Sequence, residues 1–120
     1  MIIIIKNLRN SRPSEPYDVR VDRTSVLGNP FYMHDESERD LVCDQYEEYM
    51  RAMWNNDTEY LQDKSINTFL RNKYCDCIRN LVEIYKKYGN LRLYCWCAPK
   101  RCHAESIKRL VEELVAKEVM

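Results

Sequence analysis

The chain reads Leu91-Arg92-Leu93-Tyr94-Cys95-Trp96-Cys97 between two segments of helical periodicity. Side chains of an extended strand point alternately to opposite faces, and this stretch alternates with the same period of two. It therefore predicts a β-strand whose one face carries Leu91, Leu93, Cys95 and Cys97.

Two further strands are predicted nearer the N-terminus. Ile2 to Ile5 is a run of four β-branched residues, which resists helix formation and is typical of a short buried strand. Residues 17–22 alternate again, with Val19 and Val21 on one face. The tripeptide Gly28-Asn29-Pro30 ends this segment, because glycine permits a positive φ and proline cannot donate to a ladder.

Helical periodicity fills most of the remaining chain, over residues 35–54, 65–88 and 102–118. Asp35 and Glu38 have the spacing of a capping box at the start of the first helix. Gly89 is the expected stop of the second. Residues 58–64 are either an extra helical turn or a loop.

This order, β-β-α-α-β-α, predicts one α/β domain over residues 1–120. A small three-stranded, at least partly parallel sheet would be flanked by about three helices. If the second and third strands are parallel neighbours, their C-terminal ends share one edge with two helix starts. Ligands bind at that edge in open α/β sheets, and helix N-termini attract anions. Arg23, Cys95 and Cys102 would then share one site, which an antiparallel pairing would divide.

Charge and composition disfavour some classes of binding partner. Lys and Arg number 19, as do Asp and Glu, so no net field draws the chain to nucleic acid or to an anionic membrane. We expect no general nucleic-acid binding and no membrane association. The apolar start of the chain is too short for a secretory segment or a membrane span, so a cytoplasmic protein is expected. In that compartment the six cysteines are expected to be thiols or metal ligands rather than disulfides.

The cysteine-rich segment Cys95-x-Cys97-x4-Cys102-His103 allows three interpretations. The four residues have the right chemistry and number for zinc, although the first spacing is tighter than usual. Alternatively, Cys102 and His103 are candidate catalytic residues, with the pKa of Cys102 lowered at a helix start. Neighbours on a helix diverge by about 100°, which disfavours that pair. Finally, the thiols could simply pack while His103 lines a pocket. We expect no bound metal and no cofactor.

The candidate ligand-binding residues are Arg23, Ser25, Gly28, Asn29, Phe31, Arg39, Cys95, Cys97, Cys102 and His103. Arg23 and Arg39 are expected to clamp phosphate, since a guanidinium matches the geometry of that group. Phe31, Tyr32 or Trp96 could stack on a base.

Together these motifs resemble domain-of-unknown-function family 4326, a family of short phage and bacterial proteins. Its pattern is Arg23-x-Ser25 before Gly28-Asn29-Pro30-Phe31, an arginine at Arg39, and a closing Cys95-x-Cys97-x-Pro99-x-x-Cys102-His103. The resemblance spans roughly residues 17–115 and implies a site without implying its chemistry. It also implies a role in virus–host conflict or in phage nucleotide metabolism, in the host cytoplasm if the chain is phage-encoded. The longer middle, about residues 54–90, departs from the pattern and is a candidate surface for a homo-oligomer.

The function expected from these observations is binding of a small phosphorylated nucleotide-type ligand, for instance a host nucleotide or an NAD-derived defence signal. One alternative is an enzyme acting on a nucleotide or nucleoside-type substrate through Cys102 and His103. Another is a zinc-stabilised interaction module. No P-loop, G-x-G-x-x-G or Ser-His-Asp order is present, which favours binding over catalysis.

Overall fold

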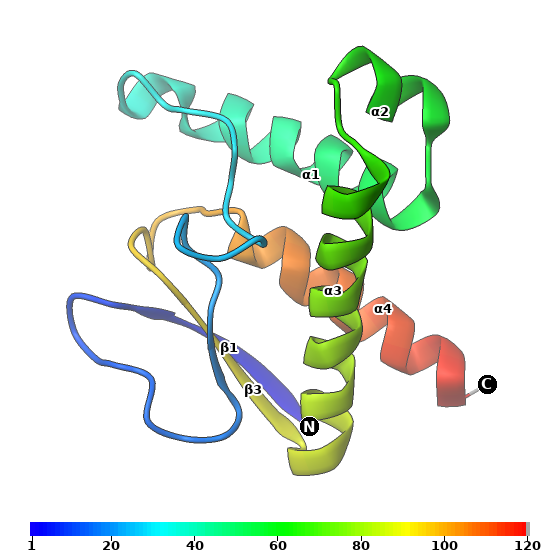
Figure 1. Ribbon diagram of the computed structural model, residues 1–120. Helices are drawn as coiled ribbons and strands as arrows, with labels where there is room; N and C mark the ends of the chain where they lie inside the picture. Colours follow the sequence, from blue (N-terminus) through cyan, green and yellow to red (C-terminus); the bar gives the residue numbers. More distant parts are fainter. Residues whose placement is uncertain (120) are drawn as a thin grey trace.

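The computed structural model describes residues 1–119 and has the α/β architecture that the sequence predicts (Figure 1). Its elements are β1 (Ile2–Asn7), β2 (Asp18–Arg20), the 3-10 helix η1 (Glu36–Glu38), α1 (Arg39–Asn55), α2 (Thr58–Asp63), α3 (Thr68–Tyr88), β3 (Asn90–Cys95) and α4 (Ala104–Val119). The segment left open between loop and helix is therefore helical, and α2 is added to the predicted order.

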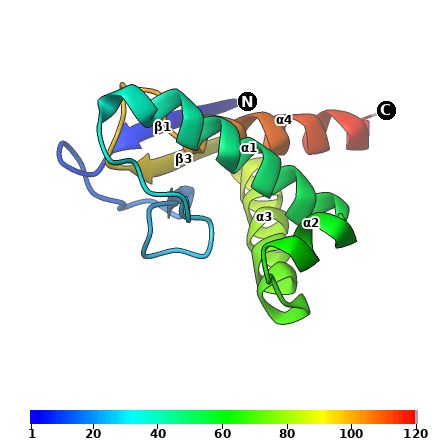
Figure 2. The ribbon, with the colours of Figure 1, turned by 90° about the horizontal axis from the view of Figure 1, so that it is seen from above.

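The three strands form one sheet in the order β1-β3-β2, and both pairs are parallel. Leu93 of β3 lies opposite Ile5 on one side and opposite Val19 on the other. The prediction that the second and third strands are parallel neighbours is thus confirmed. Figure 2 shows β1 and β3 side by side and pointing to the same end, where the segments before α1 and α4 gather.

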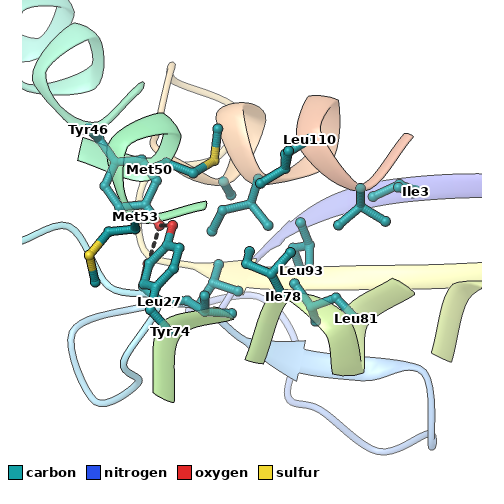
Figure 3. Close-up of a cluster of buried hydrophobic side chains, with 14 of the residues drawn as sticks. Ile3, Leu27, Tyr46, Met50, Met53, Tyr74, Ile78, Leu81, Leu93 and Leu110 are labelled. Carbon is teal, nitrogen blue, oxygen red and sulfur yellow. Dashed lines mark hydrogen bonds between the residues drawn. The ribbon is translucent and has the colours of Figure 1, made fainter. Parts of the chain in front are cut away.

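One face of the sheet carries the core. Ile3 of β1 and Leu91 and Leu93 of β3 join a single buried cluster with side chains of α1, α3 and α4, part of which Figure 3 shows. Within that cluster the hydroxyl groups of Tyr46 and Tyr74 are 2.6 Å apart. The core therefore fixes these three helices against one face of the sheet.

Three predicted helix starts and the end of one predicted strand differ from the structure. The helix expected from residue 35 begins as the 3-10 turn η1, with the Asp35 carboxylate accepting from the Ser37 amide. The helix expected from residue 65 begins at Thr68, because Ser65 has a φ of 56° and Asn67 supplies the cap. The last helix begins at Ala104, so Cys102 and His103 precede it. β3 ends at Cys95, which leaves Cys97 outside the strand.

Candidate functional site

A pocket of about 440 Å³ lies at the C-terminal edge of β2 and β3. Four segments far apart in sequence line it: the chain after β2, the loop before η1, the first turns of α1, and the stretch between β3 and α4. The predicted site residues on its wall are Arg23, Asn29, Phe31, Arg39, Cys95, Cys97, Cys102 and His103. The parallel pairing of β2 with β3 brings these residues together.

The remaining two candidates, Ser25 and Gly28, shape the turn and do not line the pocket. The Ser25 hydroxyl accepts a hydrogen bond from the Leu27 amide at 3.0 Å. Gly28 does not have a positive φ, contrary to the sequence-based reason for its presence. A Cβ there would lie 2.6 Å from the carbonyl oxygen of Asp22, so glycine is needed for close backbone contact.

Asn29 lines the pocket but its side chain is engaged elsewhere. Its amide group donates to the carbonyl oxygen of Val42 at 3.2 Å, and its side-chain oxygen accepts from the Phe31 amide at 2.9 Å. The residue is buried. Asn29 therefore fastens the loop to α1, a role that fixes the Phe31 backbone beside the pocket.

Arg23 projects from the chain after β2 and is held by neutral partners. Its Nε donates to the carbonyl oxygen of Asn29 at 3.1 Å, and its Nη2 donates to that of Phe31 at 3.2 Å. Its guanidinium carbon lies 4.3 Å from the centre of the Tyr32 ring. Among residues 1–119 no carboxylate forms an ion pair with it.

Arg39 is bound more completely than the sequence suggested. Its Nε and Nη2 each donate to the Glu36 carboxylate at 2.8 Å, and its Nη1 donates to the carbonyl oxygen of Arg101 at 2.9 Å. Arg101 also lines the pocket and pairs with Asp40 and Asp44. Arg101 was not among the residues predicted from sequence, although its place directly before the Cys-His pair was a usable signal.

The one acid on the pocket wall, Asp22, was also missed. Its carboxylate accepts from Arg20, from the Thr24 hydroxyl at 2.6 Å and from the Trp96 indole at 2.9 Å. These hydrogen bonds hold the pKa of Asp22 at about 2 even though burial opposes ionisation. The ionised Asp22 therefore positions Trp96 at the pocket edge and is itself fully engaged.

Three cysteines of one segment, Cys95, Cys97 and Cys102, line the pocket wall. The Sγ atoms of Cys102 and Cys95 are 3.1 Å apart, and all three thiols of the segment are free. Cys102 also caps α4: its Sγ accepts from the Ala104 amide at 3.3 Å, while the Glu105 carboxylate accepts from the Cys102 amide at 3.0 Å. This is a capping-box arrangement in which a thiol replaces the usual hydroxyl.

The cluster favours a thiolate on Cys97. A hydrogen bond from Cys102 overcomes burial and, with the guanidinium of Arg39, lowers the pKa of Cys97 to about 5. The Cys102 hydrogen bond also lowers the pKa of Cys95, to about 7. The pKa of Cys102 is raised, because Cys95 and Cys97 accept its proton and because it is buried. The expectation that the helix start would lower the pKa of Cys102 is therefore wrong.

His103 contacts Cys102 despite being its sequence neighbour. Its Nδ1 lies 3.8 Å from the Cys102 Sγ, and its Nε2 is bound to the carbonyl oxygen of Val21. A carbonyl can only accept, so Nε2 carries the proton and neutral Nδ1 faces the thiol. Burial lowers the pKa of His103 and keeps the ring neutral. The divergence expected of helical neighbours does not apply, because both residues precede α4.

Within the described chain, no group of three or more His, Cys, Asp or Glu side chains is arranged to hold a metal ion. The proposed zinc ligands Cys95, Cys97, Cys102 and His103 do lie together, but both His103 nitrogens face protein atoms. As far as residue 119, no helix has both the length and the apolar character required to cross a membrane.

Searches of curated proteins and of solved structures found no match. A family model described as a domain of unknown function, DUF4326, matches residues 5–113. That range includes every residue of the pocket wall. The chain therefore belongs to the DUF4326 family.

Proposed function

We propose that this protein binds a small phosphorylated nucleotide-type ligand in the pocket between β2, β3, α1 and α4. The observation that carries the proposal is the state of Arg23. Its guanidinium is fixed by two carbonyl oxygens and has no carboxylate partner among the residues described. Carbonyl groups hold the fork in place without neutralising it, so it remains able to bind a phosphate oxygen.

The charge of the pocket wall supports an anionic ligand. Arg23, Arg39 and Arg101 line it, whereas Asp22 is its single acid and is already engaged. Arg39 is ion-paired with Glu36, and Arg101 with Asp40 and Asp44, so Arg23 is the wall arginine whose charge no described carboxylate balances. Arg39 contributes rigidity, and Arg23 is the direct phosphate contact.

Aromatic side chains support a base or another flat group in the ligand. Phe31, Tyr32 and Trp96 line the pocket, and Tyr32 and Trp96 are 70% and 51% exposed. Exposed ring faces beside a positive wall suit base stacking next to a phosphate. The pocket volume also falls within the range of about 300–1,000 Å³ that is typical of small-ligand sites.

A thermal-shift screen tests the proposal directly. Mononucleotides, cyclic nucleotides and ADP-ribose derivatives should raise the melting temperature, and the matching unphosphorylated nucleosides should raise it less. The shift should vanish in Arg23→Ala and persist in Arg12→Ala, which removes an exposed arginine outside the pocket. The proposal is wrong if no phosphorylated compound stabilises the protein. For a phage-encoded chain, binding alone would suffice to sequester a host nucleotide or an NAD-derived defence signal.

A second candidate is an enzyme acting on the same class of ligand. It rests on the neutral Nδ1 of His103, 3.8 Å from the Cys102 Sγ, an arrangement in which the ring can accept the thiol proton. Product analysis of any ligand found in the screen separates the two functions. A binder returns the ligand chemically unchanged, and an enzyme loses turnover in His103→Gln while retaining most of its affinity.

A further inference from the structure

The cysteine cluster of Cys95, Cys97 and Cys102 has an arrangement that binding of a phosphorylated ligand does not require. Cys95, Cys97 and Cys102 all line the pocket, but Cys97 is half-buried whereas Cys102 is 4% exposed, with its Sγ 3.1 Å from that of Cys95. Cys75 and Cys77 lie on α3 and are not part of the pocket wall. The pocket wall thus combines one partly accessible thiol with one that is almost fully buried.

We propose that Cys97 and Cys102 form a dithiol centre that reduces a small anionic disulfide entering the pocket. Cys97 is the attacking sulfur, because it is the more accessible. Cys102 is the resolving sulfur, because it is 4% exposed, lines the same pocket wall and shares its thiol proton with Cys97. Arg23, which is bound only to carbonyl oxygens, favours a disulfide that carries carboxylate or other anionic groups.

The exchange balances in two steps. The Cys97 thiolate attacks one sulfur of a disulfide R–S–S–R′, forming a Cys97–S–S–R bond and releasing R′–S⁻. Cys102 then attacks the Cys97 sulfur, forming a Cys97–Cys102 disulfide and releasing R–S⁻. The proton of Cys102 passes through His103 Nδ1 to one of the two leaving thiolates. The protein dithiol loses two electrons, and the substrate disulfide gains them.

Two neighbours assist these steps. The guanidinium of Arg39 and the hydrogen bond from Cys102 keep Cys97 ionised near neutral pH. The neutral Nδ1 of His103 lies within proton-transfer reach of Cys102. This inference does not depend on the proposed phosphorylated ligand, and its assay contains no phosphorylated compound, so the two can fail separately.

The test uses the full chain carrying Cys77→Ser, because Cys77 is the other half-buried thiol while Cys43 and Cys75 are buried. One equivalent of dithio-bis-nitrobenzoate, an anionic aromatic disulfide, is added and the released thiolate is measured. We expect two nitrothiobenzoate ions per chain, a protein lighter by two hydrogen atoms with no adduct, and a peptide map that joins Cys97 to Cys102. Adding Cys102→Ser should halve the release and leave a stable adduct on Cys97.

If the Cys102→Ser variant does not fold, the mass and peptide map of the Cys77→Ser protein are sufficient to test the proposal. An adduct that persists in that protein overturns the proposal, because the resolving step is then missing. A peptide map that joins Cys95 to Cys102 also overturns it. So does a Cys97→Ser variant that still releases two thiolates per chain.

Discussion

The Nη1 atom of Arg39 donates a hydrogen bond to the carbonyl oxygen of Arg101 at 2.9 Å, across 62 residues of sequence. This contact joins the first turn of α1 to the segment that leads into α4. The same guanidinium acts on Cys97 and helps to lower its pKa. Arg39 thus links the shape of the pocket to the chemistry of its most accessible thiol.

Replacing Arg39 by Gln should raise the pKa of Cys97, because it removes a positive charge that favours the thiolate. Alkylation by iodoacetamide reports this, since only the thiolate reacts. In the Cys77→Ser background the rate should fall through a midpoint at about pH 5. With Arg39→Gln added, the midpoint should lie higher. Arg109→Gln, which removes an ion pair with Glu47 outside the pocket, is the control and should not move it. An unmoved midpoint in Arg39→Gln would contradict the assignment.

Gly28→Ala should destabilise the fold more than Gly89→Ala. At Gly28 the new methyl group meets backbone atoms of Asp22 and Arg23 at 2.6–2.9 Å, which cannot move aside without displacing the chain. A loss of about 3 kcal/mol or more is expected, at the upper end of overpacking. Gly89 has a φ of 68° but open space around it, so the cost there is strain alone, about 1–2 kcal/mol. Urea unfolding compares the two, and equal losses would refute the close-contact explanation.

Tyr46→Phe should cost more stability than Tyr74→Phe, although the two hydroxyl groups share one hydrogen bond. Tyr46 donates its only hydroxyl proton to the carbonyl oxygen of Leu27 at 2.8 Å, so Tyr74 is the donor between the two rings. Removing the Tyr46 hydroxyl leaves the Leu27 carbonyl oxygen and the Tyr74 hydroxyl without a hydrogen-bond partner, at a cost of about 1–3 kcal/mol each. Removing the Tyr74 hydroxyl leaves only the Tyr46 oxygen without a donor, at a cost of about 1 kcal/mol. Chemical denaturation of both variants measures the difference, and the reverse order would overturn the donor assignment.

The sequence predicted the sheet better than the helix starts. Alternation over residues 91–97 marks a strand whatever its partners are. The intervening helices allow a parallel pairing with β2 but do not require it, and the structure shows that the pairing is parallel. The start of α4 depends on Cys102 acting as a cap through its sulfur, which is outside the usual Ser, Thr, Asp and Asn set. The pattern therefore placed this helix start too early.

The convergence of these segments on one pocket could be predicted from sequence, but the chemistry of the pocket could not. Strand ends and helix starts indicate which segments converge. The acidity of Cys97 depends on Cys102 and on Arg39, a residue of another helix, and so it requires tertiary distances. The pairing of Arg39 with Glu36 is a side-chain arrangement of the same kind. Only the structure shows that Arg39 is paired with a carboxylate whereas the hydrogen-bond partners of Arg23 are all neutral.

Stability should fall as the pH drops below about 6.5, the ordinary value for histidine. Burial lowers the pKa of His103, so the unfolded chain takes up a proton that the folded chain refuses. The loss should continue until the pH reaches the folded pKa, at a slope of at most about 1.4 kcal/mol per pH unit. Cys97, whose pKa is also lowered, acts in the same direction.

Comparison with His103→Gln isolates the histidine contribution. Urea unfolding at about pH 7 and at about pH 5 should show a smaller loss in this variant than in the wild type. His34→Gln changes an exposed histidine and should keep the wild-type loss. Equal losses in all three proteins would mean that His103 is not buried in its neutral form.

Arg23→Ala should weaken binding of a phosphorylated ligand by about 1.5–3 kcal/mol, the worth of a hydrogen bond to a charged group. The affinity should therefore fall roughly tenfold to a hundredfold. Arg23→Lys should recover only part of this loss, because an ammonium keeps the charge but lacks the planar fork that Asn29 and Phe31 hold in place. Both variants should fold, since Arg23 is exposed. Titration calorimetry on a ligand from the screen provides the measurement, and unchanged affinity in Arg23→Ala would exclude the phosphate contact.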